Sequence, residues 1–164
     1  MSHGVDVLVV DDRTVDADMT LLALRLAAPN ARLLRLGDGE QALEYLFRVG
    51  RFARRCGPLP GLLLLDAEMP VVSGLCVLDL IRAHPLTYDT PVVLMSSDSG
   101  SRIRERHDTF AADAYVVKPT DFERYCALIE AMLCRWLPQI AFIGTLPQRW
   151  PAHHREKRRP ASVT

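Results

Sequence analysis

The chain has 164 residues, of which 49% are hydrophobic, and its 20 Lys and Arg balance its 20 Asp and Glu. This length fits one domain with a tail, and the hydrophobic content is sufficient for a core, which argues against disorder throughout the chain. No apolar run approaches the ~18 residues that a membrane helix requires, so we expect no membrane association.

The charges are unevenly distributed along the chain. Residues 139–164 hold five Lys or Arg and one Glu, whereas residues 1–138 hold fifteen Lys or Arg and nineteen Asp or Glu. We therefore expect one folded domain over residues 1–138 and a basic C-terminal tail over residues 139–164. A basic tail can contact nucleic acid or a membrane surface, but it is more often a solvated, disordered end, which is the interpretation that we favour.

The cysteines and the N-terminus indicate a cytoplasmic protein. The four cysteines show no C-x-x-C spacing, which argues against a metal site or a disulfide framework: Cys56, Cys76, Cys126 and Cys134. The first residues lack a charged segment followed by an apolar one, so they do not resemble a signal peptide.

The first 47 residues predict two strand–helix units. Residues 5–10 (VDVLVV) and residues 31–36 predict strands. The helix between them is expected to end at Pro29-Asn30 and to bury a stripe at helical spacing, Val15, Met19, Leu22 and Leu26. Asp38 and Gln41 form a capping box that opens the second helix. Its inward-facing residues are predicted to be Ala42, Leu43, Leu46 and Phe47.

An Arg-rich loop over residues 50–61 leads into a third and a fourth unit. Residues 62–65 (LLLL) are apolar without alternation, which is typical of a strand buried on both faces. Ser73 is expected to cap the next helix, with Pro85 at or just past its end. Residues 91–95 (PVVLM) predict a fourth buried strand, followed by a polar loop and a short helix that runs to about Ala112.

The fifth unit completes the domain. Residues 114–117 predict a strand, and Thr120 with Glu123 forms another capping box. The last helix is expected to end at Pro138 and to bury Phe122, Cys126, Ile129, Leu133 and Trp136. Five strands alternating with five helices predict an α/β fold, a doubly wound five-stranded parallel sheet. Right-handed crossovers bring the carboxyl ends of its strands to one edge, where ligands bind in such sheets.

Polar residues follow four of the five strands at that edge: Asp11, Asp12, Asp66, Ser96, Ser97 and Lys118. Three clustered carboxylates repel one another, so a cation is needed among them, and Mg²⁺ suits an oxygen-rich site that also takes phosphate. Asp66, held at the end of a buried strand, can act as a nucleophile toward phosphorus and form an acyl phosphate. Lys118 is one of only two lysines beside eighteen arginines, which indicates that an ammonium is required there.

Each of these residues also has an ordinary structural interpretation. Asp11 and Asp12 could cap the first helix, and Asp66 could cap the turn that follows it. Ser96 could be a loop hydroxyl, and Lys118-Pro119 an ordinary strand exit. Their joint occurrence, in this order at successive strand ends, favours the chemical interpretation.

These residues and their surroundings resemble the receiver domain of two-component response regulators. The matching segments are VLVVDD at 7–12, LLLLDAEMPVVSG at 62–74, PVVLMSSD at 91–98 and DAYVVKP at 113–119. The resemblance covers residues 5–136 and implies a flavodoxin-like fold of the receiver type. The Arg-rich loop, the paired serines and the C-terminal helix resemble small single-domain regulators associated with phytochrome-type histidine kinases.

The resemblance implies a phosphoacceptor site with bound Mg²⁺. Asp11 and Asp12 resemble the acidic pair that holds the metal, and Asp66 resembles the phosphoacceptor. The backbone carbonyl of Glu68 corresponds to a further metal ligand. Lys118 resembles the lysine that pairs with a phosphoryl oxygen.

The resemblance also implies a conformational switch. Ser96 resembles the hydroxyl that moves toward the phosphoryl group, and Tyr115 resembles the aromatic residue that turns inward with it. The Lys118–Pro119 bond is a candidate cis peptide. Ser97 departs from the family, where alanine is frequent. Glu68 and Asp98 are both acidic, at positions that influence the lifetime of the phosphoryl group.

The expected function is that of a switch rather than a metabolic enzyme. A sensor histidine kinase, with a bacteriophytochrome as the candidate, would phosphorylate Asp66, and the domain would assist its own phosphorylation and dephosphorylation. The candidate output is a protein contact, including a homodimer, through the fourth helix, the fifth strand and the fifth helix. The 26 residues after Pro138 are too few for a DNA-binding domain with its own core.

Three alternatives remain open on the sequence. The chain could be a receiver-like binding module that works without phosphorylation, although the intact acidic and lysine residues argue against this. It could be an aspartyl-phosphate phosphatase, but Asp66 is followed by Ala67-Glu68 and so lacks the D-x-D pattern. It could also be a regulator that binds DNA through its basic tail.

Overall fold

The computed structural model describes residues 4–97 and 111–141. Its strands are β1 (Val7–Val10), β2 (Leu33–Leu36), β3 (Leu62–Asp66), β4 (Val92–Ser96) and β5 (Ala114–Val117). Its helices are α1 (Thr14–Ala27), α2 (Gly39–Phe47), α3 (Gly74–Ala83) and α5 (Phe122–Trp136), with a 3₁₀ turn, η1 (Gly50–Phe52). Most of the short helix predicted before Ala112 and nearly all of the basic tail fall at residues 98–110 and 142–164, outside the described ranges.

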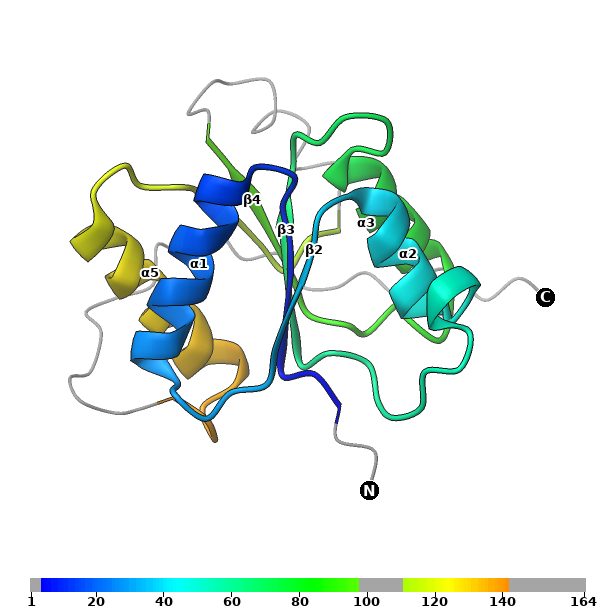
Figure 1. Ribbon diagram of the computed structural model, residues 1–164, viewed down its shortest axis with the longest axis horizontal. Coiled ribbons are helices and arrows are strands. Elements are labelled where there is room, and N and C mark those ends of the chain that lie inside the picture. The colour runs from blue at the N-terminus through cyan, green and yellow to red at the C-terminus, as the bar shows by residue number, and fades with distance from the viewer. Residues whose placement is uncertain (1–3, 98–110, 142–164) are drawn as a thin grey trace.

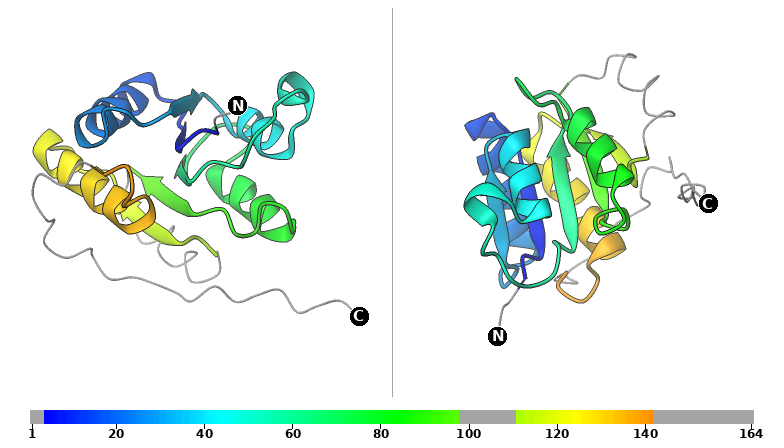
Figure 2. Two further views of the ribbon diagram at one scale, coloured as in Figure 1. Left: turned by 90° about the horizontal axis from the view of Figure 1, so that it is seen from below. Right: turned by 90° about the vertical axis from the view of Figure 1, so that its right-hand side faces the viewer.

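All five strands pair in parallel, in the order β2-β1-β3-β4-β5. Helices α1 and α5 cover one face of the sheet, and α2 and α3 cover the other (Figure 1). The view along the sheet in Figure 2 shows the same three layers. The doubly wound parallel sheet predicted from the sequence is therefore confirmed. Within the described ranges, no helix combines the length and apolar composition that crossing a bilayer requires.

The core lies on both faces of the central strands. Alternate residues of β1 and β3 enter opposite layers, because side chains along a strand point to alternating faces. Val7, Val9, Leu62 and Leu64 pack under α1 and α5. Leu8, Val10, Leu63 and Leu65 pack under α2 and α3. All eight are buried, which explains why these strands contain no alternating polar residues.

Helix α1 presents a different face to the core from the one predicted. Val15, Leu22 and Leu26 are 72%, 53% and 59% exposed, and of the predicted stripe only Met19 packs against the core. The residues that α1 buries are Ala17, Thr20, Ala23, Leu24 and Ala27. Four of these five side chains are small, which lets α1 approach the sheet and α5 closely. The bulky apolar residues at helical spacing therefore lie mainly on the outer face of α1, so the predicted stripe was not the buried face.

The helix caps were predicted with one error. Asp38 accepts a hydrogen bond from the Gln41 amide at 2.7 Å, and Ser73 accepts one from the Cys76 amide at 3.3 Å. The predicted box of Thr120 and Glu123 is wrong. Asp121 is the cap of α5 and accepts from the Arg124 amide at 2.9 Å, because the helix begins one residue later than expected. Phe122, predicted to be buried, is consequently exposed.

Arg82 fixes the end of the sheet opposite to the predicted site. Its guanidinium donates to the Ala111, Tyr88 and Thr90 carbonyls at 2.6, 2.8 and 3.0 Å. It also pairs with Asp113 at 2.8 Å, and the Asp113 carboxylate in turn accepts from the Val92 amide. Burial lowers the pKa of Arg82, while Asp113 acts to raise it. This network ties the starts of β4 and β5 to the end of α3.

Candidate functional site

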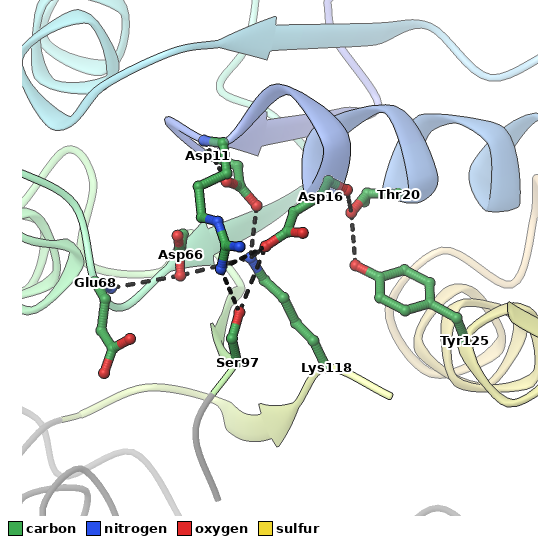
Figure 3. Close-up of polar contacts among 9 residues, drawn as sticks. Asp11, Asp16, Thr20, Asp66, Glu68, Ser97, Lys118 and Tyr125 are labelled. Atoms are coloured by element: carbon green, nitrogen blue, oxygen red, sulfur yellow. Dashed lines mark hydrogen bonds and ion pairs between the residues drawn. The ribbon is translucent and has the colours of Figure 1, made fainter. Parts of the chain in front are cut away.

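The candidate site lies at the carboxyl ends of β1, β3, β4 and β5. Asp11 follows β1, while Asp66 and Ser96 are the last residues of β3 and β4. Lys118 follows β5, and its amide donates to the Ser96 carbonyl at 2.7 Å. These four side chains are buried. In Figure 3 the Asp11 and Asp66 carboxylates and the Lys118 ammonium point toward one another.

Three carboxylates at this edge can hold a cation together. One oxygen each of Asp11, Asp12 and Asp66 lies within 4.8 Å of the other two. Oδ1 of Asp12 is buried and has no hydrogen-bond partner within the described parts of the chain. Clustered oxygen donors that include an unsatisfied buried carboxylate oxygen fit Mg²⁺, which prefers such ligands. The residues present therefore fit the metal that the sequence predicted.

The Lys118 ammonium is shared among three carboxylates. Nζ donates to Oδ2 of Asp11 at 2.6 Å and to Oδ2 of Asp16 at 3.3 Å, and it lies 3.6 Å from Oδ1 of Asp66. Burial by itself would lower the pKa of Lys118. The hydrogen bond to Asp11 and the charges of Asp66, Asp11 and Asp16 outweigh burial, so the pKa is raised. Lys118 is therefore a fixed positive charge beside the predicted acceptor.

Asp66 carries an unfavourable negative charge when no cation is present. Burial is the main cause that raises its pKa to about 6, and the charges of Asp11 and Asp12 act in the same direction. Lys118 and the Glu68 amide, which lies 3.4 Å from Oδ1 of Asp66, act to lower it. A bound cation would favour the carboxylate, which is the form that can act as a nucleophile.

Close backbone packing fixes the position of Asp66. Gly74 begins α3, and its amide donates to the Ala67 carbonyl at 3.2 Å. A Cβ atom at Gly74 would lie only 1.9 Å from the Asp66 carbonyl oxygen. The start of α3 therefore lies directly against the end of β3, and only glycine permits this approach.

Of the two switch residues predicted from the sequence, Ser96 ends β4 at the site, whereas Tyr115 lies within β5 beside Leu94. Ser96 is fully buried, and Tyr115 is half-buried against the core layer under α2 and α3. The side chain of Glu68 is exposed, so only its backbone faces the acceptor. Asp98 lies outside the described residues.

Two structural details differ from the predictions. The described residues contain no cis peptide bond, so the candidate cis bond at Lys118–Pro119 is trans. Trans is the form favoured before proline, by about 0.5–1 kcal/mol, and nothing in the sequence around Pro119 specifies the other isomer. Asp11 also takes part in a local turn, because its Oδ1 accepts from the Arg13 amide at 2.9 Å. Neither Asp11 nor Asp12 is the N-cap of α1, as one interpretation of the sequence had allowed. The N-cap is Arg13, whose side chain makes no capping hydrogen bond.

Asp16 was not predicted to belong to the site. It lies in the first turn of α1, where an acidic residue is common because it complements the helix dipole. Its carboxylate contacts Lys118, Ser97 and Arg13 at 3.3, 3.4 and 3.5 Å. The only signal in the sequence was its position in the first turn of the helix that follows the acidic pair.

Comparison with known proteins identifies the family. Residues 7–130 match the response regulator receiver domain. The chain is 28% identical to the probable methanogenesis regulatory protein FilR2 of Methanothrix harundinacea, across 84% of the chain and 94% of that protein. It is 34% identical to the probable transcriptional regulatory protein TcrX of Mycobacterium tuberculosis, across 80% of the chain but only half the length of that protein.

Solved structures with similar folds include regulators of light signalling. Response regulator RPA3017, described in red light signalling of R. palustris, is 30% identical, with a TM-score of 0.72 across 80% of the chain and 92% of that protein. The bacteriophytochrome response regulator RtBRR is also 30% identical, with a TM-score of 0.65 across 92% of the chain and 86% of that protein. Receiver domains are phosphoacceptor switches that bind Mg²⁺ at an acidic pocket and are phosphorylated by histidine kinases. The chain belongs to the response regulator receiver domain family.

Proposed function

We propose that this chain is a phosphorylation-dependent switch in which Asp66 accepts a phosphoryl group from a histidine kinase. The observation that carries the proposal is the placement of a buried carboxylate, Asp66, beside a carboxylate pair that could hold a cation and beside a buried ammonium. Oδ1 of Asp66 lies 3.6 Å from Nζ of Lys118, and Asp66 shares a 4.8 Å cluster with Asp11 and Asp12. Positive charge on both sides of an acceptor is what phosphoryl transfer requires.

In the proposed reaction, an oxygen of Asp66 attacks the phosphorus of a phosphohistidine. The phosphorus–nitrogen bond breaks, the imidazole takes up a proton, and an acyl phosphate forms on Asp66. Lys118 offsets the negative charge that the phosphoryl oxygens bring. Asp12, Asp66 and the Glu68 carbonyl would hold Mg²⁺, with Asp11 beside them. When bound, the ion supplies a Lewis acid that neutralises part of the phosphoryl charge.

The response to phosphorylation would begin at Ser96 and Tyr115. The acyl phosphate carries nearly two negative charges in place of the one on the carboxylate, and it adds three acceptor oxygens. The Ser96 hydroxyl would move to donate to one of these oxygens, and the Tyr115 ring would fill the space behind it. Since β5 carries Tyr115 and leads through Lys118 to α5, the surface of β5 and α5 would change, together with the segment between β4 and β5.

The pathway is part of the proposal. The similarity to RPA3017 and RtBRR supports a phytochrome-type histidine kinase as the phosphodonor. The output would be a protein contact of the switched surface, including contact with a second copy of the chain. Sedimentation of the protein with and without beryllofluoride, an acyl phosphate mimic, tests the dimer. A beryllofluoride-dependent increase in mass supports it, and an unchanged monomer contradicts it.

Mass spectrometry of the intact protein tests the phosphoacceptor. Wild type, Asp66→Asn and Asp12→Asn would be incubated with acetyl phosphate, with and without Mg²⁺. Wild type should gain one phosphoryl group only with Mg²⁺, Asp66→Asn should gain none, and Asp12→Asn should require much more Mg²⁺. Asp18→Asn, which removes an exposed carboxylate from α1, is the control and should behave as wild type.

A wild type that gains no phosphoryl group would be tested again with a phosphorylated histidine kinase. If the protein still gains none, the phosphoacceptor role is wrong. The chain would then act as a receiver-like module that works without phosphorylation. A phosphoryl group gained by Asp66→Asn would instead show that another residue is the acceptor.

A further inference from the structure

Asp16 brings a fourth carboxylate to Lys118, from α1 rather than from a strand end. Its Oδ2 accepts from Nζ of Lys118 at 3.3 Å, a shorter distance than the 3.6 Å between Nζ and Asp66. The Asp16 side chain is largely buried. Figure 3 shows the Lys118 ammonium among the Asp11, Asp16 and Asp66 carboxylates. In the unphosphorylated protein the ammonium is therefore shared between Asp16 on α1 and the acceptor Asp66.

Neighbouring groups hold Asp16 in this position. The Ser97 hydroxyl lies 3.4 Å from Oδ2 of Asp16, and the Arg13 guanidinium lies 3.5 Å from both Oδ2 of Asp16 and the Ser97 hydroxyl. The backbone carbonyl of Asp16 accepts from the Thr20 hydroxyl at 2.9 Å. Asp16 thus joins the first turn of α1 to the ends of β4 and β5. The Ser97 hydroxyl, absent where relatives carry alanine, contributes to this network.

We infer that Asp16 is a positioning residue for Lys118, which competes with Asp66 for the ammonium in the resting state and releases it when a phosphoryl group arrives. The inference deepens the proposed function and rests on it. Asp16 does not touch the reacting atoms, so it acts only through Lys118. Its contact with Lys118 sets how readily the ammonium becomes available to the phosphoryl oxygens.

Charge determines whether Asp16 favours or disfavours the phosphorylated state of Asp66. An acyl phosphate on Asp66 carries nearly two negative charges, in place of the single charge of the carboxylate, close to the Asp16 carboxylate. These charges repel one another across a partly buried site, and both groups compete for the same ammonium. The Asp16 carboxylate therefore disfavours the phosphorylated state. Removing its charge should raise the phosphorylated fraction at a fixed concentration of phosphodonor and saturating Mg²⁺.

The two lysines of the chain make the contact measurable without phosphorylation. Protein labelled with ¹³C at the lysine Cε position gives two NMR signals, from Lys118 and Lys157, and Lys157→Arg assigns them. In metal-free protein, Asp16→Asn should move the Lys118 signal toward the position that it takes in wild type with Mg²⁺ and beryllofluoride. Asp18→Asn removes an exposed charge from the same helix and should not move it.

The second measurement is the extent of phosphorylation by acetyl phosphate at limiting concentration. In Asp16→Asn the ratio of phosphorylated to unphosphorylated protein should rise about three- to tenfold, the effect expected for one partly buried ion pair. Asp16→Glu keeps the charge and should lie close to wild type. Asp18→Asn should equal wild type. A urea unfolding curve for each variant verifies that the comparison is made between folded proteins.

An unchanged Lys118 signal and an unchanged ratio in Asp16→Asn, with wild type phosphorylated normally, would overturn the inference and leave Asp16 as an ordinary first-turn acid. A decreased ratio would overturn it as well, since Asp16 would then assist the reaction. If wild type takes up no phosphoryl group from any donor, the proposed function fails, and the release step fails with it. The Lys118 NMR signal of the metal-free protein would then test only whether Asp16 contacts Lys118 in the unphosphorylated state.

Discussion

The hydroxyl of Tyr125 lies 2.6 Å from Oγ1 of Thr20 and joins α5 to α1 inside the core. Because the Thr20 hydroxyl donates its proton to the Asp16 carbonyl, the Tyr125 hydroxyl is the donor in this bond. Burial raises the pKa of Tyr125, against a smaller lowering by the bond to Thr20. A polar chain thus runs from α5 through α1 to the residue that contacts Lys118.

Replacing Tyr125 with phenylalanine tests the energetic value of this chain. Tyr125→Phe keeps the ring but leaves a buried oxygen of Thr20 without its donor. The free energy of unfolding should fall by about 1–2 kcal/mol, as for other buried hydrogen bonds, measured by urea denaturation. In a Thr20→Val background the same change should cost much less. Equal costs in both backgrounds would show that the two hydroxyls are not coupled.

The raised pKa of Asp66 predicts a pH dependence of stability. Since its folded pKa of about 6 exceeds the unfolded value of about 3.9, the folded state retains the proton between these values. The contribution of Asp66 to the free energy of unfolding of the metal-free wild type should therefore fall as the pH rises from about 4 to 6. Asp66→Asn removes the titration and should be more stable than wild type by about 1–3 kcal/mol at pH 7.

Urea denaturation in a chelator at pH 4, 5, 6 and 7 measures this difference. The advantage of Asp66→Asn should be small at pH 4 and increase up to pH 6. The Asp113→Asn variant, which loses a structural ion pair at the opposite end of the sheet, should be less stable than wild type at pH 7. An advantage of Asp66→Asn that does not depend on pH would rule out Asp66 titration as its source.

Removal of the metal provides a separate test of the carboxylate cluster. Mg²⁺ should raise the melting temperature of wild type, because a ligand that binds the folded state stabilises it, and a chelator should reverse the shift. Asp12→Asn should lose most of the shift, since the unsatisfied Oδ1 of Asp12 is a proposed ligand. Glu68→Gln changes an exposed side chain and should keep it. Loss of the shift in Glu68→Gln would assign the ligand to the carboxylate rather than to the backbone.

Gly74 should tolerate no side chain. In Gly74→Ala the new Cβ would lie 1.9 Å from the Asp66 carbonyl oxygen, so α3 and the end of β3 must separate. The cost should be about 1–3 kcal/mol of unfolding free energy, the usual range for overpacking, with a loss of phosphorylation. Gly37→Ala is the control, since its Cβ would meet only Nε2 of Gln41, at 3.9 Å. Similar behaviour of the two variants would argue against close packing at Gly74.

Val71 has a left-handed backbone conformation, which is unfavourable for a β-branched side chain. Its φ is 66° and its side chain is fully exposed, so no packing offsets the left-handed backbone. Val71→Asn should raise the free energy of unfolding by about 1 kcal/mol, because asparagine tolerates this region. Val71→Ala should gain less, since the alanine side chain cannot make the local hydrogen bond that favours asparagine in this region. Chemical denaturation compares the three proteins, and no gain in Val71→Asn would contradict the strain.

The strand ends were the most predictable part of the molecule. Asp66 follows four consecutive leucines, and in a parallel sheet the residue after such a strand must emerge at the ligand-binding edge. The same argument places Asp11 and Lys118, because connectivity alone determines on which edge they lie. Their convergence therefore required only correct strand assignments and the handedness of the crossovers.

The helices were less predictable, because their orientation depends on fit rather than on hydrophobicity. The buried face of α1 contains Ala23, Ala27 and a polar Thr20, whereas Leu22 and Leu26 face outward. The Thr20 hydroxyl has a local partner in the Asp16 carbonyl and a second one in Tyr125, which lies 105 residues later in the chain. Asp16 was missed for a related reason, since its role depends on how far Lys118 reaches across the site. The isomer at Pro119 likewise depends on tertiary contacts that a single sequence does not display.

The Arg82 network limits how β4 can respond to phosphorylation. Four hydrogen bonds from one buried guanidinium, together with the Asp113 bond to Val92, fix the starts of β4 and β5 relative to each other. Sliding of β4 along its neighbours would break the bond from Arg82 to the Thr90 carbonyl and the bond from the Val92 amide to Asp113. A rearrangement that begins at Ser96 must therefore be absorbed within a few residues of the carboxyl end of the strand. The sheet is then fixed at the starts of β4 and β5, and it can bend only near the carboxyl ends of these strands.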